Sequence, residues 1–349
     1  MKSFWNNLPK PFFAMAPMAD VTDVAFRTLV AKRGKPNIFW TEFVSADGLH
    51  ALADKSEKSS AQAARRRFVV PSGAKIQHDF SDSSARLNYN PLLRDLQFTE
   101  EQRPIIAQIF SSKPEMIAYA TKTVAELGFD GVDINMGCPD RAIEKQAAGA
   151  ALIKTPELAR ALINVAKRAS SLPVSVKTRV GYNNESLDKW LPALLLANPA
   201  TITLHLRTRK EMSLVPADWE LMKRAVEIRN RVNSNVLLIG NGDVRDLDDA
   251  RAKATESGCD GVMLGRAMFG NPWVFAGRKS EDTSLAEKLT ALVELAYGFE
   301  KLSPPKNFAI LKKHIKAFIS GFSGAAALRA KLMEAENATM LETIVAKYE

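Results

Sequence analysis

The sequence predicts an α/β protein, a (β/α)8 TIM barrel followed by a small all-helical C-terminal domain. Eight strand-like runs alternate with helical segments over roughly 270 residues, which is the arrangement of such a barrel. Most of these runs are apolar almost without interruption, as expected for parallel strands buried on both faces. After about residue 284 the strand-like runs stop and helical periodicity continues alone. A doubly wound open sheet is the alternative, and the lack of a G-x-G-x-x-G motif after the first run argues against it.

The expected strands follow one another along the chain. They cover residues 12–18, 38–45, 104–110, 131–138, 174–180, 201–208, 236–243 and 261–268. Between them, helices are expected at 113–128, 155–170 and 246–258. The second of these helices begins with a threonine cap, Thr155, and a first-turn proline, and the other two end at glycine.

This pattern divides the chain into two domains. We expect residues 1–280 to form the barrel and residues 284–349 to form the helical C-terminal domain. The connection between the second and third strands carries an insertion at about 52–85, in which residues 65–80 suggest a hairpin. Because loops that follow barrel strands lie on the active face, we expect this hairpin beside the barrel mouth.

Composition excludes several classes of protein. The chain has 349 residues, of which 46% are hydrophobic and 25% charged, as in globular proteins. Its formal charge of +9 permits nucleic acid or phosphorylated ligands as partners. Two cysteines rule out a disulfide scaffold, and no apolar run has the length of a signal or membrane-spanning segment. We therefore expect a soluble, cytoplasmic protein. We also expect it to be a monomer.

Residues suited to binding and chemistry gather at the carboxyl ends of the expected strands, where barrel enzymes place their sites. In chain order they are Pro17, Met18, Ala19, Gln108, Asn135, Cys138, Lys177, Arg179, His205, Arg207, Asn241, Gly242, Asp243, Gly265 and Arg266. Histidines and carboxylates are not clustered at ligand spacing, so we expect no metal. The glycines of the last two strand ends, with Arg266 beside them, are typical of a phosphate site in a barrel.

The motifs at these positions resemble those of the tRNA-dihydrouridine synthase family. They are APMADVTDVAFR, TEFVSADGL, INMGCP, AGAALI, VKTRVGY, HLRTR, ADW, GNGD and LGRAMFGNPW, in the family's order and spacing over roughly residues 12–276. The resemblance implies an FMN-dependent barrel that uses NADPH to reduce the C5–C6 double bond of a uridine in tRNA to 5,6-dihydrouridine. It also implies that the helical C-terminal domain binds the tRNA.

The resemblance implies a role for each candidate residue. Cys138 is the catalytic cysteine, Asn135 lies in the uridine pocket, and Arg179 and Arg207 are substrate-side residues. The residues that contact FMN are Pro17, Met18, Ala19, Gln108, Lys177, His205, Asn241, Gly242, Asp243, Gly265 and Arg266. The insertion is longer than the family usually has there, so its role is not implied by the resemblance. Because it carries a basic run in a loop of the active face, we expect Arg65, Arg66 and Arg67 to contact tRNA phosphates.

The chemistry of cysteine agrees with the position of Cys138. Reduction of uracil takes a hydride at C6 and a proton at C5. A thiol with a pKa of about 8.5 still holds its proton at neutral pH and can act as the acid. The alternative for a free cysteine is a small buried hydrophobe, and we accept that interpretation for Cys259.

Structural alternatives exist for the polar candidates. Lys177 is expected to face the negative charge of reduced flavin, and its alternative is an ion pair with Asp133. His205 can donate to the flavin or its phosphate, or be a satisfied core histidine. Arg179 and Arg207 can instead form ion pairs at the barrel rim. At the level of function, the alternatives are a flavin barrel that acts on a small enone or pyrimidine, and an RNA-binding barrel without activity.

Overall fold

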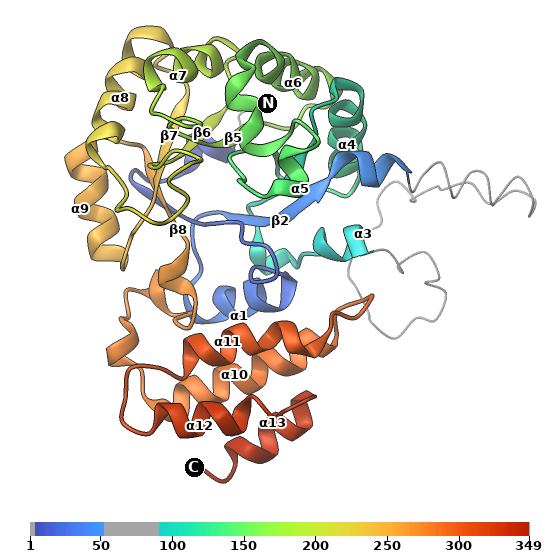
Figure 1. Ribbon diagram of the computed structural model, residues 1–349, viewed down its shortest axis with the longest axis vertical. Helices are drawn as coiled ribbons and strands as arrows, with labels where there is room; N and C mark the ends of the chain where they lie inside the picture. Colours follow the sequence, from blue (N-terminus) through green and yellow to red (C-terminus); the bar gives the residue numbers. More distant parts are fainter. Residues whose placement is uncertain (1–3, 52–90, 349) are drawn as a thin grey trace, which may run out of the picture.

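The computed structural model describes residues 4–51 and 91–348. Its centre is one sheet of eight parallel strands in the order β1-β8-β7-β6-β5-β4-β3-β2 (Figure 1). The strands are β1 (Phe12–Met15), β2 (Phe39–Ser45), β3 (Ile105–Phe110), β4 (Gly131–Met136), β5 (Val174–Arg179), β6 (Thr201–His205), β7 (Leu237–Asn241) and β8 (Gly261–Leu264). The two ends of this order meet, because Ala14 of β1 bridges Ile38 and the N–H of Met15 donates to the carbonyl of Ile38 at 3.1 Å. The sheet is a closed barrel, and the predicted fold class is confirmed.

Helices surround the sheet (Figure 1). They are α1 (Val24–Gly34), α3 (Pro91–Asp95), α4 (Pro114–Glu126), α5 (Arg141–Glu144), α6 (Pro156–Ala169), α7 (Leu187–Leu196), α8 (Glu220–Val232) and α9 (Leu247–Ser257). Side-chain caps set where several begin: the carboxylate of Asp246 accepts from the first turn of α9. Thr155 is the N-cap residue of α6 and a proline follows it, as predicted, but its side chain makes no capping hydrogen bond and its hydroxyl donates to the carbonyl of Leu152 at 3.4 Å.

The strands are buried on both faces, as their continuous apolar runs predict. Every residue of β3 and β4 is buried. Trp40 and Trp190 are among the largest fully buried side chains of the described residues. The barrel core is therefore packed with side chains, and room for a ligand is left at the carboxyl ends of the strands.

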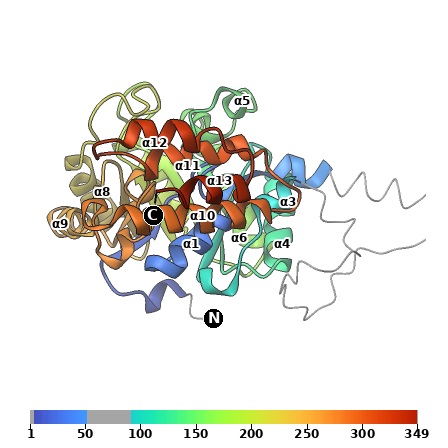
Figure 2. The same cartoon turned by 90° about the horizontal axis from the view of Figure 1, so that it is seen from below.

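Four further helices follow the barrel, and they are α10 (Leu285–Glu300), α11 (Lys312–Phe318), α12 (Ala325–Leu332) and α13 (Ala338–Val345). They form a layer below α1 in Figure 1, and Figure 2 shows that layer from beneath. Lys32 and Arg33 at the end of α1 pair with Glu294 of α10 at 2.7 and 2.6 Å. The helical tail is thus joined to the barrel. The predicted domain boundary at about residue 280 stays a prediction.

A buried ion pair also joins the two parts. Lys306, which lies between α10 and α11, places its ammonium 2.7 Å from Glu42 of β2, and the two side chains are 3% and 5% exposed. The carboxylates of Asp20 and Asp95 lie 3.7 Å from the same ammonium. Burial raises the pKa of Glu42 to about 7, although the charge of Lys306 opposes that shift.

The insertion expected at about 52–85, its hairpin at 65–80 and the arginines Arg65, Arg66 and Arg67 lie outside the described residues. Within the described ranges, every helix is too short or too polar to cross a membrane.

Candidate functional site

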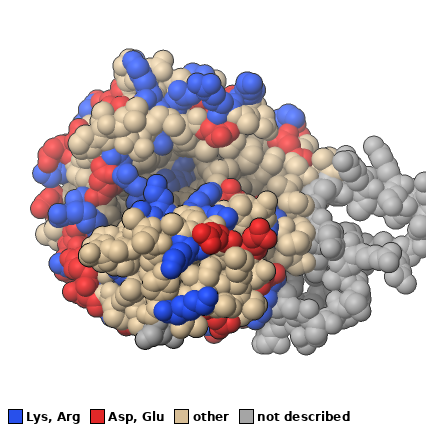
Figure 3. Space-filling view, turned by 60° about the horizontal axis from the view of Figure 1, so that its bottom comes forward, with Lys and Arg blue, Asp and Glu red and all other residues tan. Residues whose placement is uncertain are grey.

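A pocket opens where the strands end, with a volume of about 270 Å³. Figure 3 shows a face of the molecule that is hollowed near its middle, with Lys and Arg side chains gathered in and beside the hollow. All the residues predicted from the strand ends line the pocket except Ala19. Seven further residues line the pocket that were not predicted from the sequence, and they are Ala16, Phe43, Gly137, Pro139, Ser213, Val244 and Met263. The strand-end rule could have found Phe43, whereas Ser213 lies in a loop where no periodicity points to it.

Cys138 sits in a turn that its own neighbours hold in place. The amide oxygen of Asn135 accepts from the N–H groups of Gly137 and Cys138 at 3.1 and 2.9 Å. The carbonyl of Cys138 accepts from Ala150 at 2.9 Å. Gly149 makes this approach possible: its φ is +60°, and a Cβ there would lie 2.7 Å from the carbonyl oxygen of Cys138. The backbone that carries the thiol is therefore fixed.

The two cysteines have different surroundings. Cys138 is half-buried and lines the pocket, whereas Cys259 is buried and contacts the carbonyl of Gly261. Burial raises the pKa of the Cys138 thiol, although nearby Arg179 and Lys177 favour the thiolate. Cys138 therefore keeps its proton at neutral pH and can donate it.

A chain of buried hydrogen bonds supports the turn at residues 135–138 that carries the thiol, the thiol turn. Asn135 donates to the amide oxygen of Gln108 at 3.0 Å, and Gln108 donates to Asp133 at 2.7 Å. The hydroxyl of Ser175 donates to the other oxygen of Asp133 at 2.6 Å. Burial raises the pKa of Asp133 to about 6 against these hydrogen bonds. Since Asn135 is held at both ends of its amide, its orientation is fixed before any ligand arrives.

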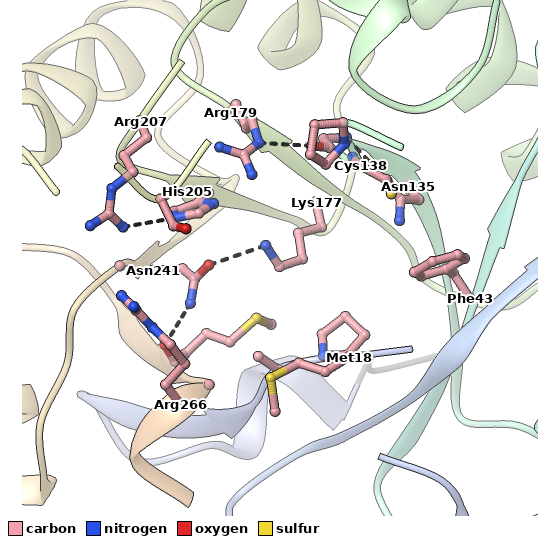
Figure 4. Close-up of a pocket in the computed structure, with 18 of the residues that line it drawn as sticks. Met18, Phe43, Asn135, Cys138, Lys177, Arg179, His205, Arg207, Asn241 and Arg266 are labelled. Atoms are coloured by element: carbon pink, nitrogen blue, oxygen red, sulfur yellow. Dashed lines mark hydrogen bonds between the residues drawn. The ribbon is translucent and has the colours of Figure 1, made fainter. Parts of the chain in front are cut away.

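Lys177 lies on β5 directly beside Asn135 of β4, and its side chain extends across the pocket floor toward β7. Its ammonium donates to the amide oxygen of Asn241 at 3.1 Å, and Asn241 donates to the carbonyl of Met263 at 2.9 Å (Figure 4). Burial, and then the charge of Arg179, lower the pKa of Lys177 to about 8. The carboxylate of Asp133 is occupied by Ser175 and Gln108 instead. The charge of Lys177 is thus poorly compensated, which favours an anionic ligand.

Arg179 and Arg207 are almost fully buried, and their guanidinium groups bind carbonyls of the protein. Arg179 donates to Gly137 at 2.8 Å, to Thr208 at 3.1 Å and to Met212 at 3.0 Å. Arg207 donates to the carbonyl of Val215 at 2.5 Å and also pairs with the carboxylate of Asp243, so the ion pair considered as an alternative for Arg207 is present. These two side chains therefore tie the thiol turn and the loop after β6 to the barrel.

His205 is a neutral ring held in one tautomer. Its Nε2 lies 3.2 Å from a guanidinium nitrogen of Arg207, and an arginine can only donate, so Nε2 accepts. Burial, followed by the charge of Lys177, lowers the pKa of His205 to about 2, so the ring is uncharged at pH 7. The proton must be on Nδ1, which leaves that nitrogen as the donor.

Asp243 organises the loop after β7. It pairs with both Arg207 and Arg266 and accepts from the N–H of Ala217 at 2.8 Å. Partial burial would raise its pKa, but the hydrogen bond from Arg207 and the adjacent charges hold it below the usual value. Gly242 precedes it with φ at +138°, and a Cβ there would lie 2.6 Å from the Cβ of Ala217. Only glycine at position 242 therefore allows the loop after β7 to pack against Ala217 while Asp243 pairs with Arg207 and Arg266.

These features define a class of protein: a parallel barrel whose carboxyl end carries a cationic pocket and one protonated thiol. Among residues 4–51 and 91–348, no three His, Cys, Asp or Glu side chains are grouped closely enough to hold a metal ion.

Comparison with known proteins makes the class specific. The model of the dihydrouridine synthase (Dus) family matches residues 14–71 and 84–347, and the chain belongs to this family. It is 36% identical over 353 residues to "Probable tRNA-dihydrouridine synthase 2" of Bacillus subtilis strain 168, with 100% of this chain and 97% of that protein covered. It is 34% identical over 351 residues to "Probable tRNA-dihydrouridine synthase" of Staphylococcus aureus strain COL, with 100% and 96% covered.

A solved structure agrees on the fold. A complex of 2-naphthoyl-CoA reductase with 2-naphthoyl-CoA superposes with a TM-score of 0.51 at 8% identity, covering 86% of this chain and 55% of that one.

Proposed function

We propose that the protein reduces the C5–C6 double bond of a uridine in tRNA to 5,6-dihydrouridine, with FMN as its cofactor and NADPH as its reductant. Membership of the family and the names of the relatives support the substrate. The observation that carries the proposal is the pairing of a half-buried, protonated Cys138 with the cationic wall around Lys177 in one pocket.

The pocket fits FMN by the chemistry of its donors. Arg266, the Nδ1 proton of His205 and the main chain around Gly242 suit a phosphate. Lys177 suits the negative charge of the reduced ring, because an anion would restore its pKa toward the ordinary value. Pro17, Met18 and Gly265 line the same pocket and would border the ring. When bound and reduced by NADPH, FMN supplies the hydride that C6 of the uracil accepts.

The residues of the chain handle the proton and the base. Cys138 donates its proton to C5, and burial keeps the thiol protonated at neutral pH until that step. Asn135 fixes the turn and keeps the thiol aimed into the pocket. Arg179 and Arg207 act by holding the turn and the loop after β6, and Arg179 adds positive charge beside the thiol as the proton leaves.

The substrate must enter as an extruded base. The thiol lies in a pocket at the barrel mouth, which no base inside an RNA stack can reach. Basic side chains around the mouth suit the phosphates on either side of that base. The target position within the tRNA follows from how the whole tRNA sits on the protein.

Product analysis tests this function. The protein is purified with its bound flavin and incubated with NADPH and an unmodified tRNA transcript, and the nucleosides are analysed by mass spectrometry. We expect a yellow protein that contains FMN and produces dihydrouridine. A protein that contains FAD or no flavin, or that reduces a free enone or pyrimidine but not tRNA, would contradict the proposal.

A further inference from the structure

The loop after β6 displays an apolar tip at the edge of the pocket. Leu214 is 85% exposed, the highest value among the large exposed apolar side chains of the described residues, and its neighbours Met212 and Val215 are 42% and 41% exposed. Ser213, between Met212 and Leu214, lines the pocket itself. A single exposed leucine is common, but three apolar side chains together at the mouth of a base-modifying site need an explanation.

The backbone holds this tip firmly. The carbonyl of Met212 accepts from Arg179 at 3.0 Å and that of Val215 accepts from Arg207 at 2.5 Å. The N–H of Leu214 donates to the carbonyl of Glu211 at 2.9 Å. Two buried arginines of the pocket wall therefore fix the loop on both sides of Leu214, so that its side chain is presented outward from a rigid support.

Basic and aromatic side chains lie around the residues that lead into the tip. Arg209 pairs with Glu144 of α5, which places that helix beside the loop. The ammonium of Lys154 lies 4.4 Å from the ring centroid of Tyr182, and the guanidinium of Arg209 lies 5.4 Å from the same ring. The N–H of Lys210 donates to the carbonyl of Tyr182 at 2.9 Å. This charge suits the phosphates of RNA and would disfavour an apolar protein partner.

We propose that Leu214, flanked by Met212 and Val215, enters the tRNA base stack and fills the gap that the target uridine leaves when it moves into the pocket. The inference rests on the proposed function. Apolar side chains inserted between bases are a general way to offset lost stacking. The rigid support matters, because a flexible loop would lose entropy on insertion.

Replacing Leu214 by a charged residue distinguishes a side chain that inserts between bases from one that only adds to the tRNA-binding surface. Leu214→Lys adds a phosphate-binding cation but removes the apolar wedge, and Leu214→Ala removes the wedge alone. Leu196 is the matched control: it is 63% exposed, at the end of α7 that leads into β6 and away from the pocket mouth. For each variant, the reoxidation of the reduced flavin is measured in a single turnover with saturating unmodified tRNA transcript, and tRNA affinity is measured by fluorescence anisotropy.

For Leu214→Ala we expect roughly 10- to 100-fold slower reoxidation at saturating tRNA, with tRNA affinity changed less than about threefold. Leu214→Lys should be equally slow although it binds tRNA as tightly as the wild type or more so. Flavin content and the rate of reduction by NADPH should stay at wild-type values, and Leu196→Ala and Leu196→Lys should match the wild type throughout. If Leu214→Lys reoxidises at the wild-type rate, Leu214 does not act as a wedge, and the proposed function is unaffected. If the reduced wild-type protein is not reoxidised by tRNA, the proposed function itself is refuted.

Discussion

Replacement of Lys177 by methionine should stabilise the protein without its cofactor and weaken its hold on the cofactor. Burial and Arg179 lower the pKa of Lys177 from 10.5 to about 8. Lowering a pKa by one corresponds to about 1.4 kcal/mol, so the charged lysine costs about 3 kcal/mol of folding free energy at neutral pH. Methionine keeps the length of the side chain and removes that charge.

The sign of the pH dependence follows from the same lowered pKa. Between about pH 8 and pH 10.5 the unfolded chain still holds the proton that the folded chain has released. The free energy of unfolding of the wild type therefore rises with pH across this window relative to that of Lys177→Met. Above about pH 10.5 the difference in stability between the two proteins disappears.

Urea unfolding of the flavin-free proteins at pH 7 and pH 10 measures both effects, and flavin titration measures the loss of affinity. Lys316→Met, at an exposed lysine of α11, is the control, and it should change neither the stability nor the affinity for flavin. The reasoning is refuted if Lys177→Met is less stable than the wild type at pH 7 or binds FMN as tightly.

Two further predictions concern the joint with the helical tail and the loop after β7. Because the folded pKa of Glu42 is raised to about 7, its contribution to stability is complete below the unfolded value and is lost as pH rises toward 7. Unfolding curves from pH 5 to pH 8 should show wild-type stability falling by roughly 2–3 kcal/mol more than that of Glu42→Gln, and equal slopes would show that the pKa of this carboxyl is not raised in the buried pair with Lys306. Gly242→Ala should lower stability by about 1–3 kcal/mol and reduce flavin content, because its Cβ would collide with Ala217. Gly277→Ala, at φ +79° with open space around it, reports the cost of a left-handed backbone without a collision, and a loss in Gly242→Ala no larger than that would exclude the collision.

The sequence predicted the residues of the site because the site follows strand ends. In a parallel barrel these ends meet at one face, so Cys138, Lys177 and His205 could be brought together from their places in the strand pattern. Contacts between side chains on neighbouring strands depend on how the strands are aligned, and the hydrophobic pattern of the sequence does not determine that register. Asp133 pairs across the sheet with Ser175, and Lys177 with Asn135, so the ion pair considered between Asp133 and Lys177 is replaced by hydrogen bonds to other partners.

Long-range contacts and irregular loops were out of reach. Glu42 and Lys306 are 264 positions apart, and only the packing of the helical tail on the barrel brings them together. Arg179 binds main-chain carbonyls, and Arg207 binds the carbonyl of Val215 as well as the carboxylate of Asp243. The contacts to Met212 and Val215 depend on the path of a loop that has no periodicity. Leucine is usually buried, so its residue type alone would not predict an exposed Leu214. The structure leaves it exposed because Arg179 and Arg207 hold the carbonyls of Met212 and Val215 on either side of it.

In the proposed reaction the thiol of Cys138 delivers the proton to uridine, and two half-reactions test this step most directly. Stopped-flow measurements follow flavin reduction by NADPH and then reoxidation by unmodified tRNA in the wild type, Cys138→Ala and Cys259→Ala. We expect Cys138→Ala to retain FMN and its reduction rate, because that half-reaction needs no proton at C5, and to reoxidise with tRNA about 10²–10⁴-fold more slowly. Cys259→Ala should behave as the wild type in both. Reoxidation of Cys138→Ala by tRNA at the wild-type rate would show that another group supplies the proton.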